Sequence, residues 1–528
     1  MSALLLHNAR IYTADPRQPH ADALAIANGR ILAIGSDDDI LAIHLPGARR
    51  ENLGGAFITP GLIDAHLHLQ WTGLALQRVA LHSATSVSEA VARVRERAER
   101  TPPGMWIEGW GWSQEAWGGH FPTAAQLDAA TQAHPVALRA KSGHALWVNT
   151  LALQQAGIGT HTPDPPGGQI VRLPDGSPSG VLLEQATRLV SDIIPLPSGE
   201  QLMDATAAAM RAMNRVGLTA VHCMDGKGGI ESFLTYQRLR EQGRSTLRVI
   251  KQLPVEDLDA VIGCGLRSGF GDAWLRVGGI KVFADGALGS RTAWMLQPYE
   301  GDPHNCGIAI YDHQQLTAFA LRAHAHGLSL TVHAIGDAAN RAALDALAAS
   351  YAQAGKDARL RDRIEHAQVL HPSDIPRFGQ LGVIASVQPI HATQDMDAVD
   401  QHWGQRGRYA YAFRSLLDSG ARLALGSDAP VESFHPLLGM HAALTRQRAD
   451  GQPIGGWHPQ QRLNLDEVLH GYTLGAAYAG YAERDIGSLE VGKCADLVVW
   501  SHDLSQLPAD ALLEAQPQRV MVDGAWLF

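Results

Sequence analysis

Eight short apolar runs recur along the middle of the chain, and their number constrains the fold more than any other feature. The runs span residues 57–69, 218–225, 247–253, 275–285, 328–336, 362–370, 382–389 and 422–430. Alanine-rich amphipathic segments, such as 315–327 and 340–355, separate most of them and favour helices. Continuous apolar strands are typical of a parallel sheet that helices cover on both faces. Periodicity alone does not distinguish an open sheet from a closed one, but eight strand–helix units favour an α/β fold with a (β/α)₈ TIM-like barrel.

The two ends of the chain have a different pattern, with short apolar runs separated by turns. Residues 23–35 contain two apolar runs around Asn28–Gly29, which is a strong signal for a β-hairpin. The C-terminal end has similar short runs and an Asp523–Gly524 turn. We therefore expect residues 1–57 and 485–528 to form one small β-sandwich domain, with the barrel spanning residues 58–484.

A long excursion separates the first barrel strand from the second. Residues 71–205 contain a helix with Ser86 and Glu89 at capping-box spacing, a tryptophan-rich stretch and a Pro/Gly-rich loop over 161–180. A connection of this length is typical of an inserted subdomain, and we expect it to form a lid over the barrel mouth.

Charge and cysteine content limit the partners and the compartment. The net charge is −10 and the sequence pI is about 6.2, which argues against nucleic acid and anionic membranes as partners. No basic leader precedes the first apolar run, and no stretch approaches the ~20 apolar residues of a membrane-spanning helix. Cysteines without a CxxC pair favour a reducing compartment, so we expect a cytoplasmic protein. They are Cys223, Cys264, Cys306 and Cys494.

Two histidines interrupt the first apolar run. His66 and His68 alternate with apolar residues, so on a strand both project to one side, with Asp64 below them. They stand at the end of the strand, where barrel enzymes keep their active sites. A metal-binding pair is one interpretation, and an interior histidine beside one at the rim is the other.

The ends of four further strands favour the metal site. They carry Lys281, His333, His366 and Asp428. Any one of these residues could be structural. A ligand-type residue at the same end of four separate strands is improbable by chance. Imidazole and carboxylate ligands together suit zinc or a similar divalent ion.

These motifs resemble the amidohydrolase superfamily, nearest to its amidohydrolase family 3 branch, which includes N-substituted formamide deformylases. The resemblance covers essentially the whole chain. The motifs that carry it are ITPGLIDAHLH, KVFADGALGSRTA, HAIGDAAN, RIEHAQ, GSDAPV and VGKCADLVVW.

The resemblance implies two divalent metal ions, with zinc expected, and a role for each ligand. His66 and His68 would hold the more buried ion, and His333 and His366 the second. Lys281 would take up carbon dioxide as a carbamate that bridges the two, a reaction that burial favours because it makes the amine neutral. Asp428 would bind the buried ion and act as the general acid and base, through a metal-bridging hydroxide and without a covalent acyl-enzyme.

The substrate contacts are less constrained by the sequence. Trp106, Trp110, Trp112 and Trp117 gather in the insertion, and Lys141, His144 and Trp147 follow. A tryptophan cluster indicates either packing or a pocket for an apolar or aromatic substrate. We name His144, Arg291, Asp285 and Trp112 as candidate substrate contacts. Asp285 could instead cap the following turn, and Cys223 could be a small core residue or a metal ligand.

The predicted function is hydrolysis of a non-peptide carbon–nitrogen bond, an amide or formamide of a small hydrophobic or aromatic substrate. Three alternatives stay open: a deaminase of the same superfamily, an ester or lactone hydrolase, and a non-catalytic protein that has lost its metals. Lys281 argues against the deaminase, since those enzymes typically lack the bridging lysine. A homodimer is possible on the sequence alone.

Overall fold

A barrel of eight parallel strands forms the largest part of the molecule. The computed structural model describes residues 3–114, 117–140, 144–226 and 229–528. The barrel strands, in their order around the sheet, are β6 (Leu62–Leu67), β13 (Leu218–Cys223), β14 (Arg248–Pro254), β15 (Leu275–Phe283), β16 (Leu330–Ala334), β17 (Arg363–His366), β18 (Ile384–Val387) and β19 (Leu423–Leu425). All seven neighbouring pairs are parallel. The barrel prediction is confirmed.

The first and last strands close the barrel only at their carboxyl ends. The backbone N–H of Asp428 donates to the carbonyl of His66 at 2.6 Å, and that of His68 donates to Ala429 at 2.7 Å. These bonds bring the segment after β19 beside the end of β6. Two predicted site segments therefore become neighbours through the backbone itself.

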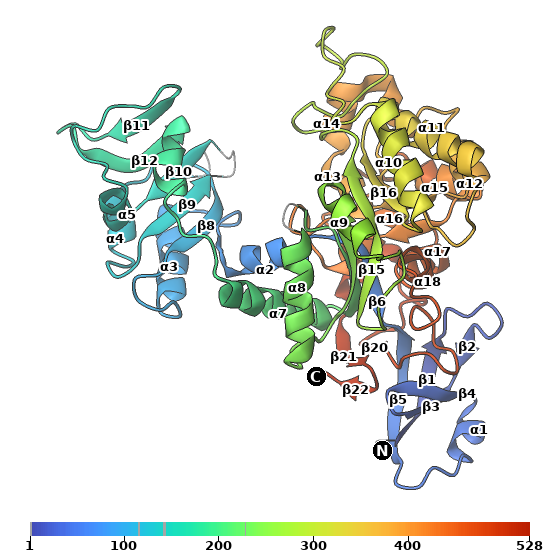
Figure 1. The fold of residues 1–528 in the computed structure, drawn as a ribbon. Coiled ribbons are helices and arrows are strands. Elements are labelled where there is room, and N and C mark those ends of the chain that lie inside the picture. Colours follow the sequence, from blue (N-terminus) through green and yellow to red (C-terminus); the bar gives the residue numbers. More distant parts are fainter. Residues whose placement is uncertain (1–2, 115–116, 141–143, 227–228) are drawn as a thin grey trace. The chain divides into compact units, whose positions relative to one another are not determined.

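Helices follow the strands and cover the outside of the barrel (Figure 1). Their bounds are α7 (Gly199–Arg215), α8 (Gly229–Glu241), α9 (Leu258–Gly263), α10 (His313–Ala325), α11 (Asp337–Ala354), α12 (Ile375–Leu381), α13 (Pro389–Gln394), α14 (Met396–Trp403), α15 (Phe413–Asp418), α16 (Pro436–Thr445), α17 (Leu465–Gly471) and α18 (Leu474–Ala479). The alanine-rich segments predicted as helices correspond to α10 and α11. In α10, Asp312 and Gln315 form a reciprocal capping box that fixes its first turn.

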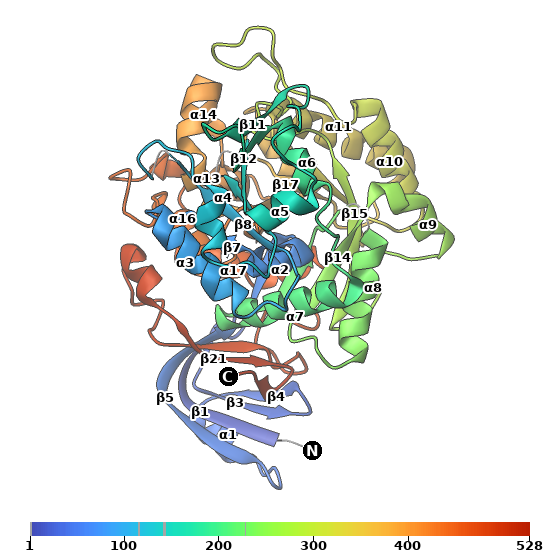
Figure 2. The same ribbon diagram turned by 90° about the vertical axis from the view of Figure 1, so that its left-hand side faces the viewer.

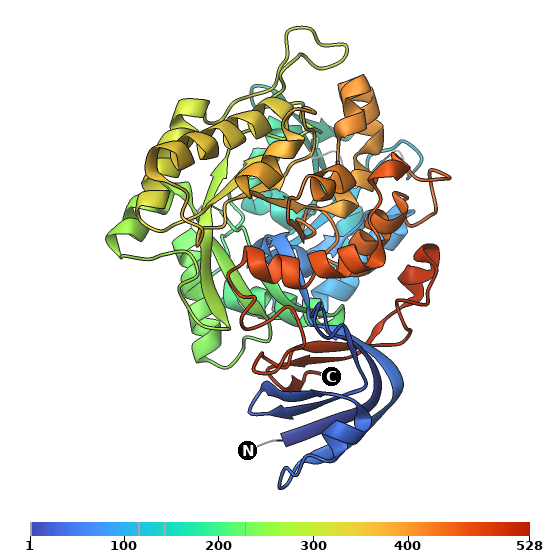
Figure 3. The same cartoon turned by 90° about the vertical axis from the view of Figure 1, so that its right-hand side faces the viewer.

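Both chain ends contribute to one small sheet. Its strands are β1 (Ala3–Tyr12), β2 (His20–Ala21), β3 (Ala23–Ala27), β4 (Arg30–Gly35), β5 (Arg49–Pro60), β20 (Leu497–Trp500), β21 (Pro517–Val522) and β22 (Ala525–Trp526). Figures 2 and 3 show both termini in this sheet.

The small sheet differs from the sandwich expected from the sequence. Its strands are hydrogen-bonded in one continuous order, rather than forming two separate facing sheets. One apolar cluster joins Ile31 of β4 to Met521 of β21, so the sheet curls around its own core. The short helix α1 (Asp37–Leu41) covers the other face through Ile40.

The run predicted as the first barrel strand is two strands. Residues up to Pro60 belong to β5 of the small sheet, and β6 of the barrel starts at Leu62. Gly61 lies between them, where a Cβ would come within 2.2 Å of the Thr219 hydroxyl oxygen. Glycine therefore allows the chain to pass directly from one sheet into the other.

Residues 73–205 form a second compact unit. Its sheet has the order β11 (Gly168–Arg172), β12 (Pro178–Glu184), β10 (Ala145–Val148), β9 (Val136–Ala140), β8 (Ile107–Trp112) and β7 (Val79–Ala80). Its helices are α3 (Val87–Ala98), α4 (Ala124–Asp128), α5 (Thr150–Gln155) and α6 (Arg188–Ser191), and α2 (Leu69–Gln77) spans the boundary between the units. Ser86 caps α3 by accepting from the N–H of Glu89 at 3.2 Å, while the Glu89 carboxylate accepts from Thr85 rather than Ser86.

Candidate metal centre

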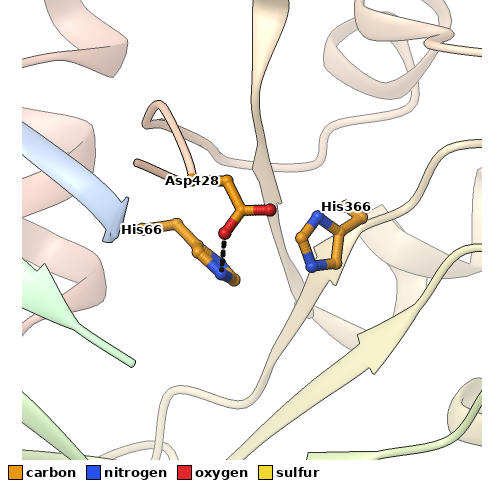
Figure 4. Close-up of side chains that lie close together, drawn as sticks. All are labelled: His66, His366 and Asp428. Atoms are coloured by element: carbon orange, nitrogen blue, oxygen red, sulfur yellow. Dashed lines mark ion pairs between the residues drawn. The ribbon is translucent and has the colours of Figure 1, made fainter. Parts of the chain in front are cut away.

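Three predicted ligands meet at the carboxyl ends of the barrel strands. His66 is the penultimate residue of β6, His366 ends β17, and Asp428 follows β19. One ligand atom from each lies within 4.8 Å of the other two, and all three side chains are buried. Figure 4 shows the three side chains directed towards one another, with Asp428 Oδ1 3.4 Å from Nε2 of His66. Two imidazoles and a carboxylate at this spacing are a suitable ligand set for a divalent ion.

The other three predicted ligands line the same cavity. His68 Nε2 lies 3.4 Å from Asp428 Oδ1, and the ring of His333 lies 4.5 Å from that of His366. With Lys281 they border a cavity of about 340 Å³. The structure thus brings all six predicted residues to one cavity. The tight group, however, combines residues that the resemblance divides between two ions.

Lys281 is buried without a partner. It projects from β15, and its Nζ forms no hydrogen bond with any residue that the structure describes. The face of the Phe283 ring lies 5.0 Å from Nζ, measured to the ring centre. Burial lowers the pKa of this amine to about 8. An unpaired buried ammonium is unfavourable, so the site fits a neutral amine or a lysine whose charge has been removed.

Two neighbouring side chains orient the histidines. Nδ1 of His66 lies 2.5 Å from Glu365 Oε2, and Nδ1 of His366 lies 2.9 Å from Gln388 Oε1. These contacts leave Nε2 of each ring to face the cavity, as in metal sites where an outer carboxylate or amide fixes the imidazole. Glu365 is itself held by Arg363.

The protonation states also fit a cation site. Burial lowers the pKa of His333 to about 3 and that of His366 well below its usual value, so both rings are neutral. Burial acts to raise the pKa of Asp428, but His66 and His68 lower it well below the ordinary value. Asp428 is therefore an ionised carboxylate in the same cavity as the neutral rings of His333 and His366.

Asp285 has a structural environment. It is buried, and it accepts from the backbone N–H groups of Trp294 at 2.9 Å, Ile335 at 3.0 Å and Gly336 at 2.8 Å. These bonds tie the loop after β15 to the end of β16. They support the turn-capping interpretation over substrate contact.

Of the remaining candidate substrate contacts, Arg291 is not among the residues that line the barrel cavity, and His144 belongs to the second unit. The half-exposed Arg291 faces Asp302, 3.5 Å away. In the second unit, exposed His144 pairs with Glu184 at 3.0 Å. Lys141 lies outside the described residues.

The tryptophans of the second unit pack mainly against one another. The ring of Trp112 lies 5.9 Å from that of Trp117 and 6.2 Å from that of Trp147. Trp112 is fully buried, and its indole donates to the Leu138 carbonyl at 2.7 Å. Trp110 is partly exposed. This arrangement favours the packing interpretation, and it argues against Trp112 as a substrate contact.

Cys223 has neighbours that support the core interpretation. Its Sγ lies 2.9 Å from both Asp225 Oδ2 and the Tyr236 hydroxyl, and burial raises the pKa of the thiol to about 12. A thiol that stays protonated is a poor metal ligand. Asp225 Oδ1 in turn lies 3.9 Å from Nδ1 of His68.

Four polar residues of the cavity were not singled out from the sequence: Gln368, His391, Asp395 and Glu432. His391, on α13, places Nε2 3.8 Å from Asp428 Oδ2, and its ring is parallel to that of His366 at 6.2 Å. Each of the four follows the end of a barrel strand by a few residues. A search for polar residues in the loops beyond the strands, rather than on them, would have found this signal.

No helix among the described residues is long and apolar enough to cross a membrane.

Comparison with known proteins agrees with the geometry. The family model described as "Amidohydrolase family" matches residues 50–528. The protein LONG AFTER FAR-RED 3 of Arabidopsis thaliana is 36% identical over 94% of this chain and 87% of its own length. The N-substituted formamide deformylase of Arthrobacter pascens is 29% identical over 99% of this chain and 98% of its own. The crystal structure of an uncharacterized metal-dependent hydrolase from Pyrococcus furiosus superposes with a TM-score of 0.76 at 28% identity, covering 95% of this chain and 99% of that one. The chain belongs to the amidohydrolase family and is one of its metal-dependent hydrolases.

Proposed function

We propose that the protein hydrolyses a non-peptide carbon–nitrogen bond, in an amide or formamide of a small, partly hydrophobic substrate. The observation that carries this proposal is the ionised Asp428 grouped with His66 and His366, with Lys281, which forms no hydrogen bond to a described residue, in the same cavity. The full-length similarity to a formamide deformylase supports the choice of bond.

His66, His68, His333, His366 and Asp428 are the residues that would hold one or two divalent ions, with zinc the expected metal. Such ions supply Lewis-acid polarisation of a carbonyl and lower the pKa of water. Lys281 Nζ would add to carbon dioxide, forming an N–C bond and releasing a proton. The resulting carbamate is an anionic oxygen ligand in place of an unpaired amine.

Asp428 performs the proton transfers in this proposal. Its carboxylate accepts a proton from the attacking water and then delivers it to the nitrogen that leaves with the amine. The glutamate behind His66 and the amide behind His366 keep the two rings in fixed orientation during this exchange.

The cavity supports a partly hydrophobic substrate. Apolar groups from Phe283, Leu288, Ile335 and Val431 line part of it. An ester or lactone would fit the same chemistry, and the lysine argues against a deaminase. The homodimer, the cytoplasmic location and the lid role of residues 73–205 stay predictions.

A substrate screen with the full chain reconstituted in excess zinc and bicarbonate tests the proposal. N-formyl and N-acetyl arylalkylamines, the matched esters, and aminopyrimidines would be compared by product release. We expect the amides to be cleaved with a kcat/KM at least tenfold above the esters. Faster ester cleavage, or ammonia release from the aminopyrimidines alone, would contradict the proposal.

A further inference from the structure

One wall of the cavity is acidic. Asp395, which follows α13, and Glu432, four residues after Asp428, both line it. No ion pair with lysine or arginine involves either carboxylate among the residues that the structure describes. Asp395 accepts a hydrogen bond from the Tyr411 hydroxyl at 2.5 Å, while Glu432 makes no hydrogen bond within the described part of the chain. Two carboxylates therefore share this wall with no cation beside them.

The absence of a counter-charge has a measurable consequence for Glu432. Burial, together with the charges of Asp395 and Asp428, raises the pKa of its carboxyl to about 7. Like charges this close are unfavourable unless something positive lies between them.

A buried amide beside the carboxylates also lacks a partner. Gln368 is 3% exposed and lines the cavity, and its Oε1 accepts no hydrogen bond from a described residue. Its Nε2 lies 3.3 Å from Nδ1 of His391, so the amide oxygen is the atom that has no hydrogen-bond partner among the described residues. A buried acceptor without a donor is unfavourable in itself and indicates a missing N–H group.

The three acceptors share a wall but come from separate segments. Gln368 follows β17, Asp395 follows α13, and Glu432 follows β19. The apolar side chains of Phe283 and Leu288 also line the cavity. The lining thus combines apolar side chains with two carboxylates and an amide oxygen that has no donor among the described residues.

We propose that Asp395, Glu432 and Gln368 form a subsite for a cationic nitrogen group of the substrate, such as an ammonium or an amidinium. The preferred substrate would then be an amide with a hydrophobic part and a separate basic group. This rests on the proposed function only for the identity of the reacting bond, because the subsite binds a cation whether or not that bond is cleaved.

The first test measures binding without turnover. Benzamidinium is compared with neutral acetophenone, which has a similar shape, by calorimetry on the metal-reconstituted full chain. We expect benzamidinium to bind at least tenfold more tightly. In Glu432→Gln and Asp395→Asn we expect this preference to fall about tenfold each, the scale of one hydrogen bond to a charged group. Glu514→Gln, at an exposed carboxylate that does not line the cavity, is the matched control and keeps the full preference.

Two outcomes would overturn the subsite. One is acetophenone binding as tightly as benzamidinium, and the other is a preference that survives both substitutions. A third equivalent of divalent metal that disappears in Glu432→Gln would assign the wall to a metal and overturn it too. If Asp395→Asn fails to fold after losing the Tyr411 bond, Glu432→Gln carries the test, since its side chain has no such bond.

A kinetic comparison separates this inference from the proposed function. N-formyl-4-(aminomethyl)benzylamine and N-formyl-4-methylbenzylamine differ in one basic group at a distance from the amide. We expect the first to have a KM at least tenfold lower, with the gain lost in Glu432→Gln. Benzamidinium selectivity without cleavage of either compound would retain the subsite and refute the amide hydrolase. Cleavage of both compounds with equal KM values would retain the amide hydrolase and refute the subsite.

Discussion

The barrel cavity and the core of the second unit have similar sequence signals but opposite hydrogen bonding. The sequence suggests functional residues in both, metal ligands in the cavity and a substrate contact at Trp112 in the second unit. In the second unit the indole N–H groups of Trp112, Trp117 and Trp147 each donate to a backbone carbonyl. In the cavity, Lys281 Nζ, Gln368 Oε1 and His391 Nε2 form no hydrogen bond with any described residue. Satisfied buried groups stabilise a fold, whereas unsatisfied ones indicate a missing ligand.

Two buried lysines on adjacent barrel strands also differ in whether they have hydrogen-bond acceptors. Lys251 on β14 donates to the carbonyls of Asp225 at 2.5 Å and Gln252 at 2.7 Å. Lys281, on the adjacent strand, has no acceptor within the described residues. The same residue type on two adjacent strands has hydrogen-bond acceptors in one case and is available for chemistry in the other.

The largest effect is expected at Asp428. Asp428→Asn keeps the size of the side chain but removes the carboxylate that accepts and returns the proton. We expect kcat/KM to fall by roughly 10³-fold to 10⁴-fold, with the far-UV circular dichroism spectrum unchanged. Activity within tenfold of the original enzyme would remove Asp428 from the acid–base role.

Trp112→Ala is the corresponding change in the second unit. Because Trp112 is fully buried, the cavity left behind should lower the free energy of unfolding by about 3–5 kcal/mol. Chemical denaturation measures this loss, and KM for any substrate found should change less than twofold. A large rise in KM with little loss of stability would instead make Trp112 a substrate contact.

Lys281→Ala should separate the two lysines. We expect the bound metal to fall and activity to drop by roughly 100-fold, the scale of a lost metal-site partner. Short carboxylic acids should restore part of the activity by supplying the missing oxygens.

Lys251→Met is the matched control for this change. It leaves two buried carbonyls unpaired and should cost about 1–3 kcal/mol of stability. Metal content, measured by atomic emission, should stay unchanged. An equal loss of metal in both variants would contradict the distinction between the lysines.

The smallest of these effects is expected for a substitution of Glu365, which contacts Nδ1 of His66. Glu365→Gln keeps a hydrogen-bonding group beside Nδ1 but removes its charge, so metal affinity should fall by about 10-fold to 100-fold. Competition with a fluorescent chelator measures the affinity. Gln388→Glu, which adds a charge behind His366, should act in the opposite direction.

Sequence alone predicted the parts of the molecule that depend on buried apolar runs. The strand at 330–334 falls inside the predicted run at 328–336, since only a fully covered strand is apolar at every position. His66, His366 and Asp428 could be brought together in advance because parallel strands end at the same rim.

Features that depend on pairing or on loops could not be predicted in this way. The strands of the two chain ends look alike in sequence, and nothing local specifies that they form one curled sheet rather than a sandwich. His391 and Glu432 reach the cavity from segments without a periodic pattern. The tryptophan-rich stretch could have been a pocket or a core, since both require large apolar side chains.

The single residue between β5 and β6 has a practical consequence. Gly61 donates its N–H to the Asp496 carbonyl, and the strand that begins one residue later ends in the first histidine pair. Shortening either tail would release the anchor of that strand, so a minimal catalytic fragment cannot be obtained by trimming the ends. The position of the metal-site histidines therefore depends on residues at both ends of the chain.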